Sequence, residues 1–188
     1  MKKRSKKENI FKYFLNILTR YFLLILVALP GLYIFYFIFT PLTVYPVYFF
    51  LGLFFDTILL SKIHILVNNV PIELISACIA GAAYYLLLVL NLSTPKIKLN
   101  TRIKAILFSF AAFLVLNILR IFVLSCLAVK NFSYFDITHT LFWYGFSTII
   151  VVAIWFAEVK IFKIKEIPFY SDIKYLAKKS LFKIKKSH

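Results

Sequence analysis

The sequence predicts an all-α multi-pass membrane protein with about four transmembrane helices, an outer interfacial or re-entrant helix and a small extracytoplasmic β-hairpin. The 188-residue chain is 62% hydrophobic and 19% aromatic, which is too apolar for a soluble domain. Four runs without Asp, Glu, Lys or Arg approach or exceed the roughly 20 residues that cross a bilayer. These runs are 21–55, 74–95, 105–119 and 137–157.

The distribution of the bases predicts which segments face the cytoplasm. Twenty of the 23 Lys and Arg residues lie in residues 1–20, 96–104 and 160–188. The positive-inside rule places such segments in the cytoplasm, where they also meet anionic lipid headgroups. The net charge of +16 is thereby explained by the membrane surface, and no nucleic acid is expected as a partner. The chain divides into a basic cytoplasmic N-terminus (1–20), a membrane-embedded domain (21–160) and a basic amphipathic cytoplasmic tail (161–188).

The first apolar run is predicted to cross outward as a retained segment, because it is far too long for a signal peptide and no cleavage site follows promptly. Residues 44–60 are nearly long enough to span, yet a second crossing here would invert every basic loop that follows. We expect them to form a helix that lies in the outer interface or dips into the bilayer. Pro41 and Pro46 are expected to mark its start.

The segment KIHILVNNVPIELI, residues 62–75, predicts an outward-facing β-hairpin. Two runs rich in β-branched residues flank Asn68 and Asn69, which tolerate the left-handed backbone of a tight turn. Pro71 then has to lie in an edge strand, since it has no N–H to donate to a neighbouring strand.

The later apolar runs complete the topology. Residues 74–95, 105–125 and 138–158 enter, exit and return, so that both termini are cytoplasmic and residues 41–73 lie outside. The tail from residue 171 onward predicts a basic amphipathic helix on the inner membrane surface.

Three residues that can carry chemistry fall near the outer face in three different spans. Cys78 lies in the first turns of its span, and His139 opens the last span. Arg120 lies about five residues, or roughly 7.5 Å of helical rise, inside the outer end of the span between them. A histidine that accepts the thiol proton and a cation that stabilises the oxyanion complete the minimum for thiol catalysis. These residues predict an active site near the extracytoplasmic face.

Each of these residues also has a structural interpretation. Cys78 can be a small packing residue, and Arg120 can extend its side chain to the outer headgroups. His139 can cap its helix near Asp136. Asn117, one turn before Arg120, either orients the guanidinium or bonds a neighbouring helix. Because a guanidinium inside an apolar helix costs at least about 2.5 to 3.5 kcal/mol on insertion scales, Arg120 is a functional candidate by default.

The remaining cysteine and histidine signals are interpreted as structural. His64 falls in the hairpin, and Cys126 lies near the exit of a span. Two cysteines without a CxxC motif argue against a metal ribbon or a disulfide scaffold, although one disulfide between Cys78 and Cys126 stays open. The sequence has no metal-ligand cluster or glycine-rich phosphate loop, so no metal and no cofactor are expected.

The pattern of these residues resembles the exosortase and archaeosortase family of membrane cysteine enzymes, most closely the pacearchaeosortase branch. The resemblance covers roughly residues 24–158. It rests on Thr40-Pro41-Leu42, Glu73-x-x-x-Ala77-Cys78-x-x-Gly81, Asn117-Ile118-Leu119-Arg120-Ile121, and His139 with Gly145 downstream. The family has Ser-Gly directly after the cysteine, where this chain has Ile79-Ala80-Gly81.

The resemblance implies a protein-sorting transpeptidase in which Cys78 is the nucleophile, Arg120 the transition-state stabiliser and His139 the proton-transfer residue. Such enzymes recognise exported proteins that end in a short motif, a hydrophobic helix and a basic cluster, and they pass the cleaved terminus to a lipid-linked amine. The expected partners are such substrates and membrane lipids. Three nearby polar residues would support the site: Glu73, Asn117 and Asp136. The alternative function is a non-catalytic membrane protein that binds lipid headgroups or partner helices.

Overall fold

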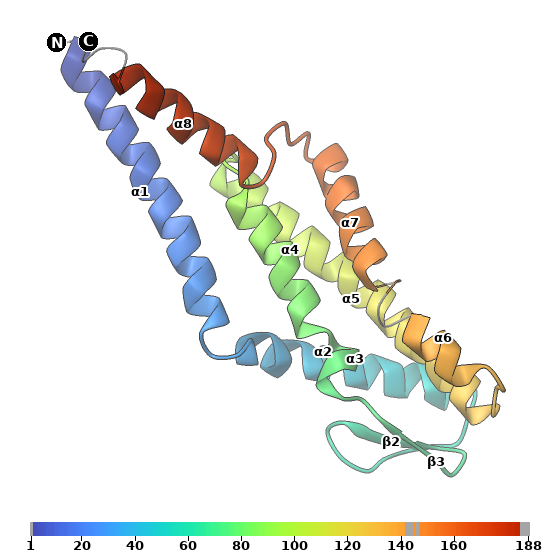
Figure 1. Cartoon of the computed structure of the whole chain (residues 1–188). Helices are drawn as coiled ribbons and strands as arrows, with labels where there is room; N and C mark the ends of the chain where they lie inside the picture. Colours follow the sequence, from blue (N-terminus) through green and yellow to red (C-terminus); the bar gives the residue numbers. More distant parts are fainter. Residues whose placement is uncertain (1, 142–144, 146, 185–188) are drawn as a thin grey trace.

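The computed structural model describes residues 2–141, 145 and 147–184, and the side chains among them except those of residues 2–10, 136 and 178–184. The described part is mostly helical, with a small antiparallel sheet (Figure 1). Its helices are α1 (Lys2–Ala28), α2 (Tyr33–Gly52), α3 (Ser76–Ile79), α4 (Gly81–Ser93), α5 (Leu99–Val129), α6 (Phe135–Leu141), α7 (Ser147–Ile161) and α8 (Tyr170–Ile184). Its strands are β1 (Thr57–Leu59), β2 (His64–Val67) and β3 (Val70–Glu73).

Four helical segments of the described chain are long and apolar enough to cross a membrane: Phe11–Ala28, Tyr33–Gly52, Ser76–Ser93 and Leu99–Val129. This number agrees with the sequence prediction, but the members differ. Of the predicted span 138–158, the structure describes residues 138–141 in α6, residue 145, and residues 147–158 in α7, while residues 142–144 and 146 lie outside the described residues. The segment Tyr33–Gly52, which the sequence prediction did not treat as a separate span, is one of the four.

The predicted helix break at Pro41 and Pro46 is wrong, because both prolines lie inside α2. The break comes earlier, after Pro30, where Gly31 and Leu32 have φ angles of 61° and 63°. Left-handed residues end a helix whatever its hydropathy. A proline inside an apolar helix is tolerated where packing against neighbouring helices compensates for the lost backbone hydrogen bond.

Helix α1 runs antiparallel beside α4. The Arg20 Nη1 group donates a hydrogen bond to the Leu92 carbonyl at 3.0 Å, near the end of α4. Further along, the Tyr85 hydroxyl donates to the Leu24 carbonyl at 3.1 Å, near the start of α4. Helix α1 therefore ends about midway along the bundle formed by α4, α5 and α7.

Helix α2 continues in the same direction along the second half of α5. Near its start, the Phe39 ring lies 5.6 Å from the Phe110 ring, measured between centroids. Just beyond its end, the Phe54 ring lies 5.9 Å from the Phe122 ring. Helices α1 and α2 thus follow one another along the bundle, α1 beside α4 and α2 beside the second half of α5, so that together they run its length once. Figure 1 shows the sheet at the end that α2 reaches, and the start of α1 and the end of α8 at the opposite end.

The predicted hairpin is confirmed. Strands β2 and β3 pair antiparallel around Asn68 and Asn69, whose φ angles of 46° and 66° match a two-residue turn. The strand order β1-β2-β3 puts Pro71 in an edge strand, as expected.

Strand β1 corrects the predicted helix 44–60. Helix α2 ends at Gly52, and Thr57 to Leu59 pair with β2, with Thr57 opposite Val67. A Cβ atom on Gly52 would lie 3.1 Å from the Thr57 hydroxyl oxygen, so glycine allows the chain to turn directly from the helix into the strand. Residues 57–59 form a strand because they lie beside β2, and hydropathy does not predict that proximity.

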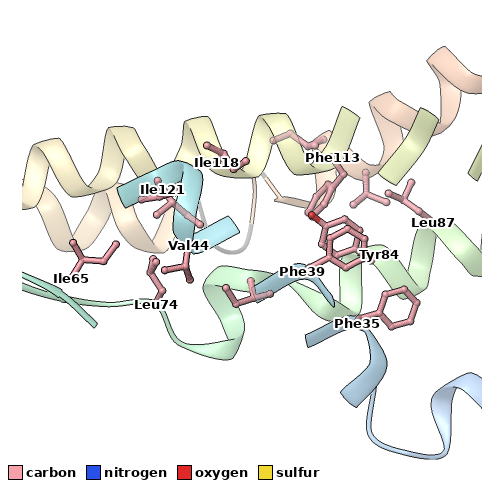
Figure 2. Packing of buried hydrophobic residues seen from close by; sticks show 14 of the residues in the cluster. Phe35, Phe39, Val44, Ile65, Leu74, Tyr84, Leu87, Phe113, Ile118 and Ile121 are labelled. Carbon is pink, nitrogen blue, oxygen red and sulfur yellow. The ribbon is translucent and has the colours of Figure 1, made fainter. Parts of the chain in front are cut away.

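The hydrophobic core joins the sheet to the helices. Tyr84 lies at its centre, with its ring 3.6 Å from that of Phe39 and 4.8 Å from that of Phe113. Figure 2 shows a second group around Leu74 and Ile65, which pack near residues of α2 and α5. The chain on either side of α3 is therefore held by buried contacts.

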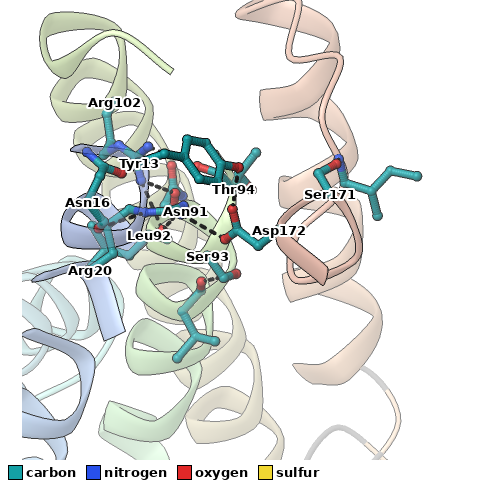
Figure 3. A network of polar contacts seen from close by, with 12 residues as sticks. Tyr13, Asn16, Arg20, Asn91, Leu92, Ser93, Thr94, Arg102, Ser171 and Asp172 are labelled. Carbon is teal, nitrogen blue, oxygen red and sulfur yellow. Dashed lines mark hydrogen bonds and ion pairs between the residues drawn. The ribbon is translucent and has the colours of Figure 1, made fainter. Parts of the chain in front are cut away.

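A buried polar network joins the first helix, α1, and the last helix, α8, to the end of α4 (Figure 3). Arg20 on α1 forms an ion pair with Asp172 on α8 at 2.7 Å, and the Tyr13 hydroxyl donates to the same carboxylate at 2.8 Å. Arg102 at the start of α5 donates to the carbonyls of Leu92 and Thr94. These guanidinium groups satisfy carbonyls that a helix end leaves without partners. The predicted tail helix is present as α8, and Asp172 anchors it.

Candidate active site

Cys78 lies in α3, a single helical turn between the sheet and α4. The turn follows Ile75, whose backbone is extended, and the Cys78 N–H donates to the Ile75 carbonyl at 2.8 Å. It ends at Ala80, which has the left-handed angles φ 59° and ψ 43°. Helix α4 begins anew at Gly81. The cysteine is thus carried by a short turn whose two ends have fixed, non-helical backbone.

Gly81 allows α2 to approach this turn closely. A Cβ atom at position 81 would lie 2.8 Å from Cζ and 2.9 Å from Cε1 of the Tyr36 ring, which is closer than real Cβ contacts. The absence of a side chain at Gly81 therefore lets Tyr36 lie against the start of α4.

Helix α5 contributes two polar residues on one face. The Asn117 Nδ2 group donates a hydrogen bond to the Cys78 carbonyl at 2.9 Å, so it bonds a neighbouring helix, one of its two predicted roles. Arg120 lies three residues further along, on the same face of the helix. Its guanidinium lies within the range at which it would attract a Cys78 thiolate. The structure therefore brings Cys78, Asn117 and Arg120 together.

The Arg120 side chain is buried, with 8% of its surface exposed, so it does not extend out of the protein. Its Nη1 group donates to the Ser147 Oγ atom at 2.6 Å. Its Nε–H group is buried and has no acceptor among the described residues. A buried donor without an acceptor is costly, so this group is available to an incoming oxygen atom.

Ser147 was not singled out by the sequence reasoning. It opens α7, two residues after Gly145, and its one weak signal is a hydroxyl at the start of an apolar run. Folding brings this hydroxyl to Arg120, 27 positions away in sequence.

His139 lies on α6, which packs against α5. Its half-buried ring stacks on the Phe135 ring, with centroids 5.7 Å apart. The side chain of Asp136, predicted to support it, lies outside the described residues. The proton-transfer role of His139 stays a prediction.

Glu73, the last residue of β3, pairs across the hairpin with His64. Their Oε1 and Nε2 atoms are 3.7 Å apart, and the side chains are 53% and 45% exposed, so water screens the pair. Glu73 also lies within electrostatic range of Cys78, where its carboxylate would repel a thiolate. It therefore lies at the edge of the site.

Both cysteines are free thiols, and the disulfide left open by the sequence is not formed. Cys126 lies on α5, half-buried against the hydrophobic core, and Cys78 packs against the same core from α3. Among the residues that the structure describes, no three or more His, Cys, Asp or Glu side chains are grouped so as to hold a metal ion.

The arrangement places a thiol within electrostatic range of a buried cation whose Nε–H has no acceptor among the described residues. Such a pair can stabilise negative charge on the sulfur or on an oxygen atom that approaches it. Comparisons of the chain with protein-family models, curated proteins and solved structures gave no match.

Proposed function

We propose that this chain is a membrane-embedded cysteine transpeptidase that cleaves the C-terminal sorting signal of exported proteins and transfers them to a lipid-linked amine. One observation carries the proposal: the Cys78 turn is bonded to Asn117, and the buried Arg120 on the same helix lies within electrostatic range of the Cys78 side chain. A guanidinium held inside the protein beside a cysteine fits an oxyanion-stabilising role better than a purely structural one.

In the proposed reaction the Cys78 thiol gives its proton to His139, and the thiolate attacks the carbonyl carbon of the client's scissile peptide bond. Arg120 stabilises the tetrahedral oxyanion, for which its free Nε–H is a suitable donor. The C–N bond then breaks, His139 returns the proton to the leaving amine, and a thioester remains. An acceptor amine attacks the thioester and forms an amide. Its proton passes through His139 to the departing sulfur.

The backbone after the cysteine supports the resemblance on which the substrate class rests. The family pattern has glycine at the position of Ala80, and the backbone there is left-handed, the conformation that glycine adopts most readily. The position that has serine in the family is occupied by Ile79, which is buried and has no hydroxyl. We therefore assign no chemical role to this position.

We propose that both termini are cytoplasmic and that the site faces outward. The sheet lies at one end of the bundle, while the start of α1, the end of α8 and the loops between α4 and α5 and between α7 and α8 lie at the other (Figure 1). That second end carries the three basic segments, which the positive-inside rule places in the cytoplasm.

A second candidate function is favoured by the packing of Cys78 against the hydrophobic core. In this alternative the protein is a non-catalytic membrane protein, the thiol fills space, and the bond from Arg120 to Ser147 only joins α5 to α7. The two functions differ in what they require of the Cys78 sulfur.

The test is co-expression with exported proteins of the same organism that end in a hydrophobic helix and a basic cluster. Wild-type protein should shorten a client and form an adduct with it that hydroxylamine releases. Cys78→Ser should leave the client uncleaved, because an alkoxide is far harder to form than a thiolate. The matched control Cys126→Ser should cleave normally. Equal cleavage by wild type and Cys78→Ser would refute the enzyme and support the non-catalytic alternative.

A further inference from the structure

A basic hollow of about 340 Å³ lies between two loops far from Cys78. One wall is the loop between α4 and α5, which contributes Lys96 and Lys98, and the other is the loop between α7 and α8, which contributes Lys163 and Lys165. Figure 1 shows both loops at the end of the bundle opposite the sheet. Glu166 is the one acidic residue among the described residues that line it.

The hollow keeps an excess of positive charge after internal pairing. Lys96 Nζ and Glu166 Oε1 form an ion pair at 2.7 Å, and the hydrogen bond from Lys96 lowers the pKa of the Glu166 carboxyl. Lys98, Lys163 and Lys165 are exposed and have no carboxylate partner in the described part of the chain. Three cations are therefore available to an anion in the hollow.

The start of α5 adds backbone donors to this wall. Lys98 is the residue before the first helical turn and makes no side-chain cap, and that turn contains no acidic residue. Thr101 of the same turn lines the hollow. The first N–H groups of a helix have no partner within it, and the positive end of the helix dipole favours an anion there.

We propose that this hollow binds the phosphate group of an anionic phospholipid. Ile97 and Phe162 line the same hollow, which suits a ligand with hydrocarbon next to its phosphate better than free phosphate. Basic pockets between membrane helices on the cytoplasmic side are suited to lipid headgroups. The site is independent of the proposed thiol chemistry, because it lies at the other end of the bundle.

The experiment measures lipid binding to the purified full chain in neutral detergent by native mass spectrometry, with phosphatidylglycerol, phosphatidylcholine and inorganic phosphate as ligands. The double variant Lys98→Gln with Lys165→Gln should raise the Kd for phosphatidylglycerol about thirty-fold. The matched control Lys62→Gln with Lys130→Gln removes the same charge from exposed positions at the sheet end and should stay within about twofold of wild type. Replacing Lys98 and Lys165 by arginine keeps the positive charge and should preserve binding. This variant shows that the weaker binding of the glutamine variant is due to lost charge and not to misfolding.

Three results would overturn the proposal. Equal weakening by the two glutamine pairs would mean that only total charge matters. Equal affinity for phosphatidylcholine would remove the anionic lipid as the ligand. Displacement of phosphatidylglycerol by millimolar inorganic phosphate would identify a soluble anion instead.

Discussion

Replacing Asp172 by alanine tests whether one buried ion pair anchors the tail helix to the bundle. The side chains of Arg20 and Asp172 are 6% and 4% exposed, so water screens their attraction little. Alanine leaves the Arg20 guanidinium buried without a counterion and also removes the acceptor of the Tyr13 hydroxyl. Breaking a buried pair from one side costs about 3 to 5 kcal/mol.

The structure also limits this loss. Arg20 keeps its hydrogen bonds to the carbonyls of Asn16 and Leu92, and α8 can move away so that water reaches the guanidinium. The cost therefore cannot exceed the free energy with which α8 docks, and we expect about 3 kcal/mol. For a chain of this size that corresponds to a melting temperature lower by about 6 to 12 °C.

The assay is thermal unfolding of the purified protein in detergent, with hydrogen exchange of α8 as a local measurement. Tyr13→Phe removes one hydrogen bond and should cost only about 1 kcal/mol. The double variant Arg20→Met with Asp172→Leu replaces both charges by apolar groups and should unfold within about 1 kcal/mol of wild type. If Asp172→Ala melts within about 2 °C of wild type and exchange in α8 does not rise, the pair does not hold the tail.

Three further predictions concern the candidate site and its orientation. Gly81→Ala places a Cβ 2.8 Å from the Tyr36 ring and should lower the free energy of unfolding, measured by thermal unfolding, by about 1 to 3 kcal/mol. Adding Tyr36→Ala should restore much of this loss, and an unchanged melting temperature in Gly81→Ala would contradict the close contact. Arg120→Lys keeps the charge but loses the planar fork, so client processing should fall by about 10² at normal membrane abundance, and wild-type processing by this variant would end the catalytic assignment. A cysteine introduced at Asn68 should react with an impermeant maleimide in intact cells, whereas protection there would invert the proposed topology.

Local chemistry predicted the hairpin well, because the turn follows from Asn68 and Asn69 and the edge position from the missing N–H of Pro71. The division of the first apolar run was predicted at the wrong place. Pro30-Gly31 and the pair Pro41 and Pro46 are both helix-breaking signals. Hydropathy does not tell which of the two ends a helix in the folded protein. Packing decides which prolines a helix tolerates, and packing is known only after folding.

The candidate site could be predicted only in part, because the sequence shows unusual residues but not which of them fold together. Cys78 and Arg120 are conspicuous because a thiol and a cation are unusual in apolar runs, and the structure places them within electrostatic range of each other. Ser147 has no such signal, since serine is common in membrane helices. The pairing of Arg20 with Asp172 joins positions 152 apart, which no local pattern reveals.

The bond from Asn117 to the Cys78 carbonyl has a consequence for how this protein can diverge. Asn117, which bonds the Cys78 carbonyl, and Arg120 are on one helix, three residues apart, so α5 positions both relative to the cysteine turn, while Ser147 of α7 also holds the guanidinium. The hairpin, the tail and the connecting loops can lengthen, shorten or change composition without altering that relation. Chains that keep this geometry are free to lose all other resemblance, provided that one helix retains an amide and a guanidinium one turn apart and a short turn still presents the cysteine to them.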